Sequence, residues 1–177
     1  MAPESRRSYM IDTNVLSHRA DAHANPPVAE WLRRYAGLLR ISVVTMAEMH
    51  RGLILLETKI EALSDGRVKA RKHARLTRKR AWYEEVAERF ADRLEPIDLA
   101  IAEKWAEISV RFPSLRDADK AIAATALAKN HGVATENIGD FRRTGVHLVN
   151  PFDRETWDAD QEVDPIARIL RNGGDRN

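Results

Sequence analysis

The amino-acid sequence predicts an α/β fold with a mainly parallel central sheet. Short apolar runs alternate with longer stretches of helical periodicity, which is the pattern of strands joined by crossover helices. The chain has 177 residues, 44% of them hydrophobic, enough for one globular domain with its own core. We expect a single domain over residues 1–153 and a polar, partly flexible C-terminal extension over 154–177.

The elements are expected in alternating order. Strands are expected at 8–11, 38–44, 132–135 and 146–149, with a very short connector or strand at 96–97. Helices are expected from the Pro26-Pro27 pair, over 45–63, over 68–94, after an Asp98 cap, and over 115–131. Gly132 is expected to end the last of these helices, because glycine readily follows a helix in the left-handed conformation.

The composition excludes several kinds of site. The chain has no cysteine, which excludes a disulfide framework, a thiolate zinc site and a cysteine nucleophile. It also lacks a serine nucleophile elbow, a phosphate-binding glycine-rich loop and a dinucleotide fingerprint. No apolar run is long enough for a signal peptide or a membrane span, so we expect a cytoplasmic protein with no membrane partner.

Charge is unevenly distributed along the chain. The net charge is +2, yet residues 66–82 hold eight lysines and arginines and no acid, so removing those eight leaves −6 for the rest. A basic helical segment beside an otherwise acidic body suits a polyanionic substrate that is handled through bound cations.

The first expected strand ends in three side chains that carry oxygen. Asp12, Thr13 and Asn14 directly follow a short apolar run. In open α/β sheets the carboxyl edge of the strands is where ligands bind. Asp12 is therefore the first candidate for a functional acid, provided that other parts of the chain deliver oxygen ligands to the same edge.

Glu48 follows the second expected strand and has two interpretations. Thr45 and Glu48 fit a capping box, in which the glutamate bonds back to the start of its helix. The same position also lies near the carboxyl end of a strand, at the edge that holds Asp12 if the sheet is parallel. The residues alone leave both interpretations open.

Two further places repeat this pattern. Asp117 and Asp119 lie at the start of an alanine-rich helix, where acids also stabilise the helix dipole; Asp117 is the better N-cap candidate. Asn137 and Asp140 follow the strand that ends at Thr135, although both residue types are common in turns.

These positions together predict an all-oxygen site. The six histidines are scattered and show no ligand spacing, and oxygen ligands favour Mg²⁺ or Mn²⁺ over zinc. Clustered carboxylates repel one another unless a cation holds them together. Such a cation can activate water and stabilise charge on a phosphoryl oxygen.

The four stretches resemble the motifs of the PIN-domain ribonucleases, in particular the VapC toxins of bacterial toxin–antitoxin pairs. The matching residues are 10–17 around Asp12, 44–52 around Glu48, 119–126 beginning at Asp119, and 134–152 around Asn137. Each motif is weak alone, but the four occur in the family's order over residues 8–153 and are together highly specific. The resemblance implies an α/β/α sandwich with three layers. It also implies metal-dependent RNA cleavage, a homodimer, and a small VapB-like antitoxin, expected to bind DNA, whose tail fills the active-site groove.

Carried over residue by residue, the resemblance makes Asp12, Glu48 and Asp119 the metal-binding catalytic acids. The fourth catalytic position, often aspartate in the family, is Asn137 here, which offers a neutral oxygen and puts a second metal in doubt. Asp140 is expected to compensate in part, and Thr13, Asn14 and Asp117 to support the ligands. The expected products carry a 5′-phosphate and a 3′-hydroxyl.

Other interpretations of the chain remain open. A non-catalytic PIN-like module that binds RNA or a partner is favoured by the neutral Asn137. A phosphatase with an aspartyl nucleophile would need a second aspartate where Asn14 stands. The basic segment, with Arg67, Arg71, Arg75 and Arg78 near one helical stripe, is expected to bind RNA phosphates. The alternatives are that it is simply solvated, that it pairs with Glu84, Glu85 and Glu88, or that it receives an acidic antitoxin segment.

Overall fold

The computed structural model describes residues 7–20 and 25–157. Its centre is a parallel sheet of five strands in the order β3-β2-β1-β4-β5. The strands are β1 (Tyr9–Ile11), β2 (Leu39–Ser42), β3 (Leu94–Glu95), β4 (Gly132–Ala134) and β5 (His147–Val149). The predicted α/β class with a parallel sheet is therefore confirmed, and all five carboxyl ends lie at one edge.

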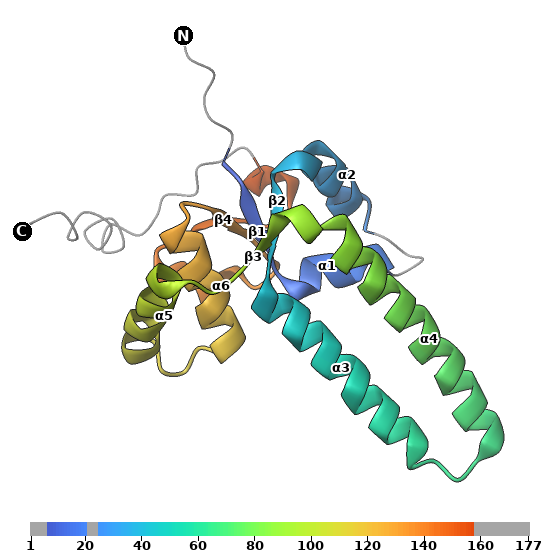
Figure 1. Cartoon of the computed structure of the whole chain (residues 1–177). Helices are drawn as coiled ribbons and strands as arrows, with labels where there is room; N and C mark the ends of the chain where they lie inside the picture. Colours follow the sequence, from blue (N-terminus) through green and yellow to red (C-terminus); the bar gives the residue numbers. More distant parts are fainter. Residues whose placement is uncertain (1–6, 21–24, 158–177) are drawn as a thin grey trace, which may run out of the picture.

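Helices cover both faces of the sheet, so the molecule has the three layers implied by the resemblance (Figure 1). One layer holds α5 (Leu99–Arg111) and α6 (Asp117–Ala128), which pack on Met10 and Val133. The other holds α1 (Thr13–Ala20), α2 (Pro26–Arg34), and the bases of α3 (Val43–Glu61) and α4 (Gly66–Arg89). A short α7 (Ile138–Phe141) follows β4.

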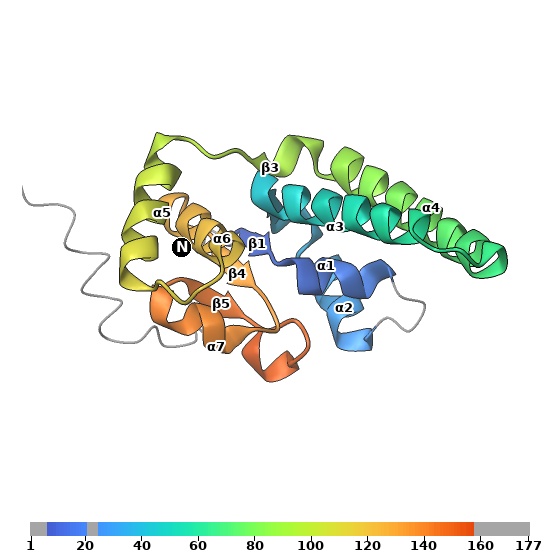
Figure 2. The same ribbon diagram turned by 90° about the horizontal axis from the view of Figure 1, so that it is seen from below.

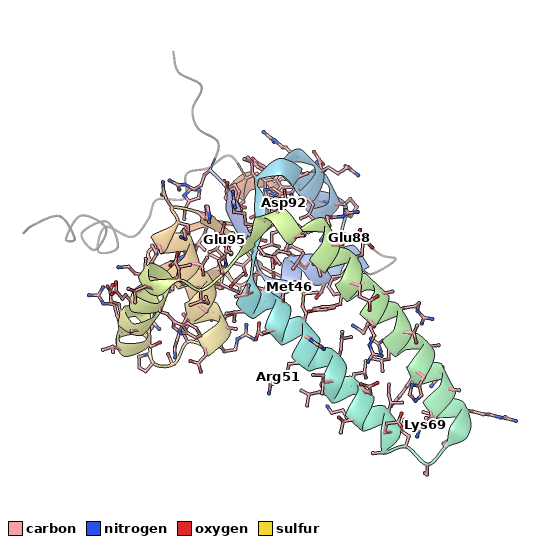
Figure 3. The ribbon with its side chains drawn as sticks, in the orientation of Figure 1. Met46, Arg51, Lys69, Glu88, Asp92 and Glu95 are labelled. Carbon is pink, nitrogen blue, oxygen red and sulfur yellow. The ribbon has the colours of Figure 1, made fainter. Side chains whose placement is uncertain are left out.

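The pair α3 and α4 forms a long antiparallel hairpin that extends well beyond the sheet (Figure 2). Its outer part is held by a small cluster in which Leu53, Ile60 and Leu76 are buried. Figure 3 shows Lys69 near the tip of the hairpin and Met46 at its base. The hairpin therefore has a base that belongs to the main core and a distal part that does not.

The second strand ends earlier than its sequence suggests. Val43 and Val44 are β-branched, which favours a strand, but α3 already begins at Val43. Ser42 caps this helix by accepting a hydrogen bond from the Val44 N–H at 3.2 Å. The predicted capping box of Thr45 and Glu48 is therefore wrong, and the Thr45 hydroxyl is buried without a hydrogen-bond partner.

Other boundaries also differ from expectation. The short strand lies at β3 rather than at 96–97, while the Asp98 cap is confirmed by its bond to the Ile101 N–H. α4 begins earlier than expected, at an Asp65 cap, and gives way to a 3₁₀ turn after Arg89. The helix α1 was not foreseen.

Gly132 does not end a helix. The residue that takes the left-handed conformation after α6 is Asn130, with φ 53°, and asparagine tolerates that region better than most residues. Gly132 instead lies in β4, where an added Cβ would come within 2.6 Å of the Tyr9 ring. The glycine is required because the Tyr9 side chain covers this part of the neighbouring strand.

The packed part of the chain continues past residue 153. Trp157 is buried in the core cluster beside α2, and the Tyr35 hydroxyl donates to its carbonyl at 3.4 Å. The division at residue 153 stays a prediction, and most of the expected extension lies outside the described residues.

Candidate active site

Asp12 lies at the centre of the carboxyl edge, directly after β1. It is only 1% exposed, and its backbone N–H donates to the Ala134 carbonyl at 3.0 Å, which continues the pairing of β1 with β4. The central position follows from the strand order, because β1 lies between β2 and β4. The side chain therefore reaches the edge between the two neighbouring chain segments that carry the other candidate residues.

Two threonines hold the Asp12 carboxylate. The Thr135 hydroxyl donates to one oxygen at 2.7 Å, and the Thr13 hydroxyl donates to the other at 3.1 Å. The Asn14 amide donates to Thr135 Oγ1 at 3.3 Å, and the Asn137 N–H donates to the same oxygen at 2.9 Å. The resulting network fixes the carboxylate in one orientation and leaves its remaining lone pairs for a cation or a proton donor.

Asp119 projects from the first turn of α6 and is bound by an arginine. Arg116 donates two hydrogen bonds to its carboxylate, at 2.9 Å and 2.8 Å. Asp119 is only 1% exposed, while the Arg116 side chain is mostly exposed. Desolvation raises the pKa of Asp119, the Arg116 guanidinium lowers it in part, and the charges of Asp12 and Asp140 raise it, so that the net shift is upward.

Glu48 lies one turn into α3 and belongs to the same electrostatic cluster. Burial raises its pKa; the charge of Arg116 opposes that shift, and the charges of Asp119 and Asp12 add to it. Thr13, which bonds to Asp12, and Arg116, which bonds to Asp119, line the same pocket as Glu48, so the three acids lie near one another. Arg51 also lowers the pKa of Glu48, and Figure 3 shows Arg51 on the side of α3 away from α4.

The remaining candidate residues, Asn137, Asp140 and Asp117, have fewer interactions with the three acids. Asn137 is exposed at the start of α7, and its N–H, rather than its side chain, joins the threonine network. Asp140 is exposed but adds to the negative charge felt by Asp119. Asp117 points away, since it is largely exposed and pairs with Lys120 at 3.0 Å. The expected N-cap role of Asp117 is wrong, because Arg116 occupies the cap position without a side-chain capping bond.

The donor set matches a hard divalent cation in chemical type, because it consists of carboxylate, hydroxyl and amide oxygens. These oxygens are not arranged around one point as the ligands of a bound metal would be. Among the described residues no group of three or more His, Asp or Glu side chains is placed to hold one ion. The guanidinium of Arg116 takes the position of a cation on Asp119, so an ion would share that carboxylate with the arginine or displace the arginine from it.

Sequence reasoning missed two residues of this site. Thr135 directly follows β4, the strand that pairs with β1, so its place at the carboxyl edge was available from the predicted strands. Arg116 carried a subtler signal, because a cation at a helix N-terminus is electrostatically unfavourable. An arginine three residues before a buried aspartate indicates a partner for that aspartate.

The sequence over most of its length matches a known family. The PIN domain model matches residues 9–146, which is well over half of the chain. The chain belongs to the PIN-domain family. This region contains Asp12, Glu48, Asp119 and Asn137, and the resemblance drawn from the sequence is confirmed.

Characterised relatives of this PIN domain have similar length. Toxin FitB of Neisseria gonorrhoeae is 30% identical over 148 residues, covering 81% of this chain and 97% of the relative. VapC ribonuclease Y4jK of Sinorhizobium fredii is 28% identical over 150 residues, with coverage of 81% and 97%. The crystal structure of FitAcB from Neisseria gonorrhoeae has a TM-score of 0.58 at 29% identity and covers 81% of this chain and 98% of that chain.

Within the described residues of this PIN domain, no helix is long and apolar enough to cross a membrane.

Proposed function

We propose that this PIN-domain protein is a divalent-metal-dependent endoribonuclease that acts as the growth-inhibiting toxin of a toxin–antitoxin pair. One observation carries the proposal. Asp12, Glu48 and Asp119 come from separate elements at the carboxyl edge of the sheet, and the pKa of Glu48 is raised first by burial and then by the charges of Asp119 and Asp12. The names of two relatives, a VapC ribonuclease and a toxin, support the same reaction and role.

Asp12, Asp119 and Glu48 would hold the cation, which we propose is Mg²⁺ or Mn²⁺. When bound, such an ion acts as a Lewis acid that lowers the pKa of water and stabilises charge on a phosphoryl oxygen. Hydrolysis of the phosphodiester bond would leave a 5′-phosphate and a 3′-hydroxyl.

The protein's own side chains orient and balance this site. Thr13 and Thr135 fix both oxygens of Asp12, and Asn14 holds Thr135 in turn. Arg116 neutralises part of the charge on Asp119 while keeping most of its side chain exposed. Its guanidinium is therefore available to an RNA phosphate, for which its fork of donors is well suited.

A toxin needs a neutralising partner. We therefore propose a small VapB-like antitoxin, itself DNA-binding, that covers the active-site groove, and a homodimer as the assembled form. Both proposals rest on the family and on the relative that is named a toxin. The test is whether the neighbouring gene encodes such a small protein, whose co-expression should restore growth and give a stable complex on size-exclusion chromatography.

We also propose that the basic face of α4 contacts RNA phosphates. Arg67, Arg71, Arg75 and Arg78 follow one another at helical spacing, all exposed. Within the part of the chain that the structure describes, none of them forms an ion pair. The alternative that the basic segment pairs with Glu84, Glu85 and Glu88 is not met by any ion pair of the described residues, since Glu85 pairs with Arg89 outside the segment. Free cations on one face of a helix suit a polyanion.

The salt dependence of RNA binding tests this face. Replacing the four arginines by glutamine should reduce the slope of log K against log salt by roughly 3, because each phosphate contact on a single strand contributes about 0.7. The matched control replaces four exposed arginines elsewhere, namely Arg33, Arg111, Arg142 and Arg143. Equal slopes in the two variants would show that the α4 face is merely solvated.

The nuclease proposal is tested by Asp119→Asn. The variant should lose RNA cleavage in Mg²⁺ or Mn²⁺ buffer while its circular dichroism spectrum stays that of the wild type. Glu103→Gln, which changes an exposed acid on α5, is the matched control and should cleave normally. Wild-type cleavage by Asp119→Asn, or cleavage that continues at full rate in chelator, would contradict the proposal.

A second candidate is a PIN-like module that binds RNA or a partner without cutting it. The observation in its favour is the hold of Arg116 on Asp119 together with the neutral Asn137. This candidate predicts that the purified wild type binds RNA but leaves it intact at every Mg²⁺ and Mn²⁺ concentration. Cleavage by the wild type alone decides between the two functions.

A further inference from the structure

A pocket of about 320 Å³ opens beside the acidic edge, at the base of the α3–α4 hairpin. Four parts of the chain line it. The lining includes Thr13 of α1, Glu48 and two leucines of α3, Lys79, Trp82 and Tyr83 of α4, and Arg116. The pocket therefore joins the candidate active site to the basic helix.

The lining differs from one part of the pocket to another. Thr13, Glu48 and Arg116 belong to the acidic edge. Trp82 and Tyr83 contribute partly exposed aromatic rings from α4. Lys79 lies one turn before these rings, is exposed, and forms no ion pair among the described residues. The pocket thus combines apolar ring surface with two cationic side chains, Lys79 and Arg116.

We propose that this pocket receives one unstacked nucleobase of a single-stranded RNA, next to the phosphodiester bond that is cut. The inference rests on the proposed nuclease function and adds to it the residues that hold one base of the substrate. Trp82 and Tyr83 form the surface for the base, and Lys79 binds the phosphate that follows it.

Aromatic rings and cations in one pocket favour a nucleotide over other occupants. Every base presents a flat π-face that stacks on an aromatic side chain, and every phosphate carries a charge that Lys79 can neutralise. An apolar peptide would use the rings and the leucines but leave Lys79 unpaired. A base in a duplex is already stacked and paired, so only a single strand, loop or bulge can place a base here.

The pocket also connects two sites that were described separately. Glu48 and Arg116 lie both in the pocket and in the acid cluster. Lys79 lies four residues after Arg75 in α4, so it extends the stripe of Arg67, Arg71 and Arg75 by one helical turn. An RNA strand that runs along α4 therefore reaches the acidic edge through this pocket, and the base held there sets the position of the cut.

The first test measures binding, in the Asp119→Asn background so that RNA is not degraded. The probe is a fluorescent single-stranded RNA of random sequence. Lys79→Gln should weaken binding about tenfold, while Lys72→Gln, an exposed lysine of α4 outside the pocket, should change it less than twofold. Equal effects of the two changes would overturn the proposal.

The second test measures base preference at the cut, using active protein and a randomised single-stranded RNA whose product ends are sequenced. Trp82→Leu should lose the wild-type preference at one position next to the cut, whereas Trp82→Phe, which keeps an aromatic face, should retain it. A preference unchanged in Trp82→Leu would overturn the proposal. Trp82 packs partly against the core, so if Trp82→Leu fails to fold, the Lys79 result decides.

Failure of the inference can be distinguished from failure of the proposed function. If the wild type cuts no RNA and Asp119→Asn binds none, both are overturned. If RNA is cut normally by the pocket variants, with unchanged preference and affinity, only the nucleobase pocket is overturned. If those variants instead lose affinity for the cognate antitoxin alone, the pocket is a protein-docking site and the inference is wrong.

Discussion

Two clusters of charged side chains lie against the same sheet. They differ in how far basic side chains neutralise their acids. At the carboxyl edge, Arg116 is the one basic side chain among the described residues that forms an ion pair with Asp12, Glu48 or Asp119, and it binds Asp119. On the α5–α6 side, the buried Glu95 contacts two basic partners, Arg40 at 2.7 Å and His131 at 3.4 Å. Figure 3 shows Glu95 close to the sheet, away from the hairpin tip.

The difference separates a structural cluster from a functional one. Glu95 has the partners that a buried carboxylate needs, so its cluster requires nothing from outside the chain. The edge has more acids than cations, and burial and mutual repulsion raise the pKa of Glu48 and Asp119. Buried acids without enough basic partners lower the stability of the folded protein. Their presence at this edge indicates that a ligand neutralises their charge.

The largest expected effect is on RNA cleavage, measured for one acid from each cluster. Asp12→Asn should lower RNA cleavage by roughly 1000-fold, because several kcal/mol of transition-state stabilisation depend on the acids at this edge. Glu95→Gln should leave the cleavage rate within about twofold. The measurement is initial cleavage rate at saturating Mg²⁺ for both variants. Similar losses in the two would mean that the clusters do not differ in role.

The free energy of unfolding should show the reverse comparison, with a clear effect of changing Glu95. Glu95→Ala should lower the free energy of unfolding by about 2 kcal/mol, since it removes the carboxylate partner of the largely buried His131 and of the partly exposed Arg40. Urea denaturation monitored by circular dichroism measures the change. Glu84→Ala, an exposed acid on α4, is the control and should alter stability by less than about 0.5 kcal/mol. A loss for Glu95→Ala no larger than the control would show that this cluster is not structural.

Arg116→Ala removes the arginine that forms the ion pair with Asp119. In chelator at pH 7 the variant should be less stable by about 1 kcal/mol, a modest value because the arginine is largely exposed. The loss should shrink as the pH falls and Asp119 becomes protonated, since the arginine pairs only with the ionised carboxylate. Denaturation curves at pH 7 and pH 4 measure this, and a loss that is independent of pH would contradict the pairing.

The smallest expected effects concern pH and have opposite signs for the two clusters. The pKa of Asp119 is raised in the folded state, so its contribution to stability is present at low pH and is lost as the pH rises through that raised pKa. The pKa of His131 is lowered by burial, so its contribution is present above its ordinary value of 6.5 and is lost as the pH falls through the lowered pKa.

Melting temperatures between pH 4 and pH 8 in chelator separate these two contributions. Relative to the wild type, Asp119→Asn should gain stability as the pH rises. His131→Gln should gain relative stability as the pH falls below 6.5. Parallel curves for all three proteins would show that neither group titrates differently in the folded and unfolded states.

Much of the fold and of the edge could be predicted because local patterns determine them. The apolar run before Asp12 and the alanine-rich run after Asp119 each specify an element and where it begins or ends. The Ser42 cap was missed because β-branched Val43 and Val44 favour a strand locally, whereas packing of the hairpin base favours the helix. The Arg116–Asp119 contact could not be read with certainty, because whether an arginine bonds inward or is solvated depends on the burial of its partner.

The division of the hairpin into an anchored base and a distal part has a consequence for engineering. The distal part of the hairpin is held by Leu53, Ile60 and Leu76, with Leu56 and Tyr83 packed against them, and the loop from Ala62 to Asp65 is largely exposed. Exposed connections between helices that contact little else tolerate inserted sequence. A peptide tag or a fluorescent reporter placed after Ser64 should leave the sheet and its acidic edge intact, and would provide a handle on the protein far from the chemistry.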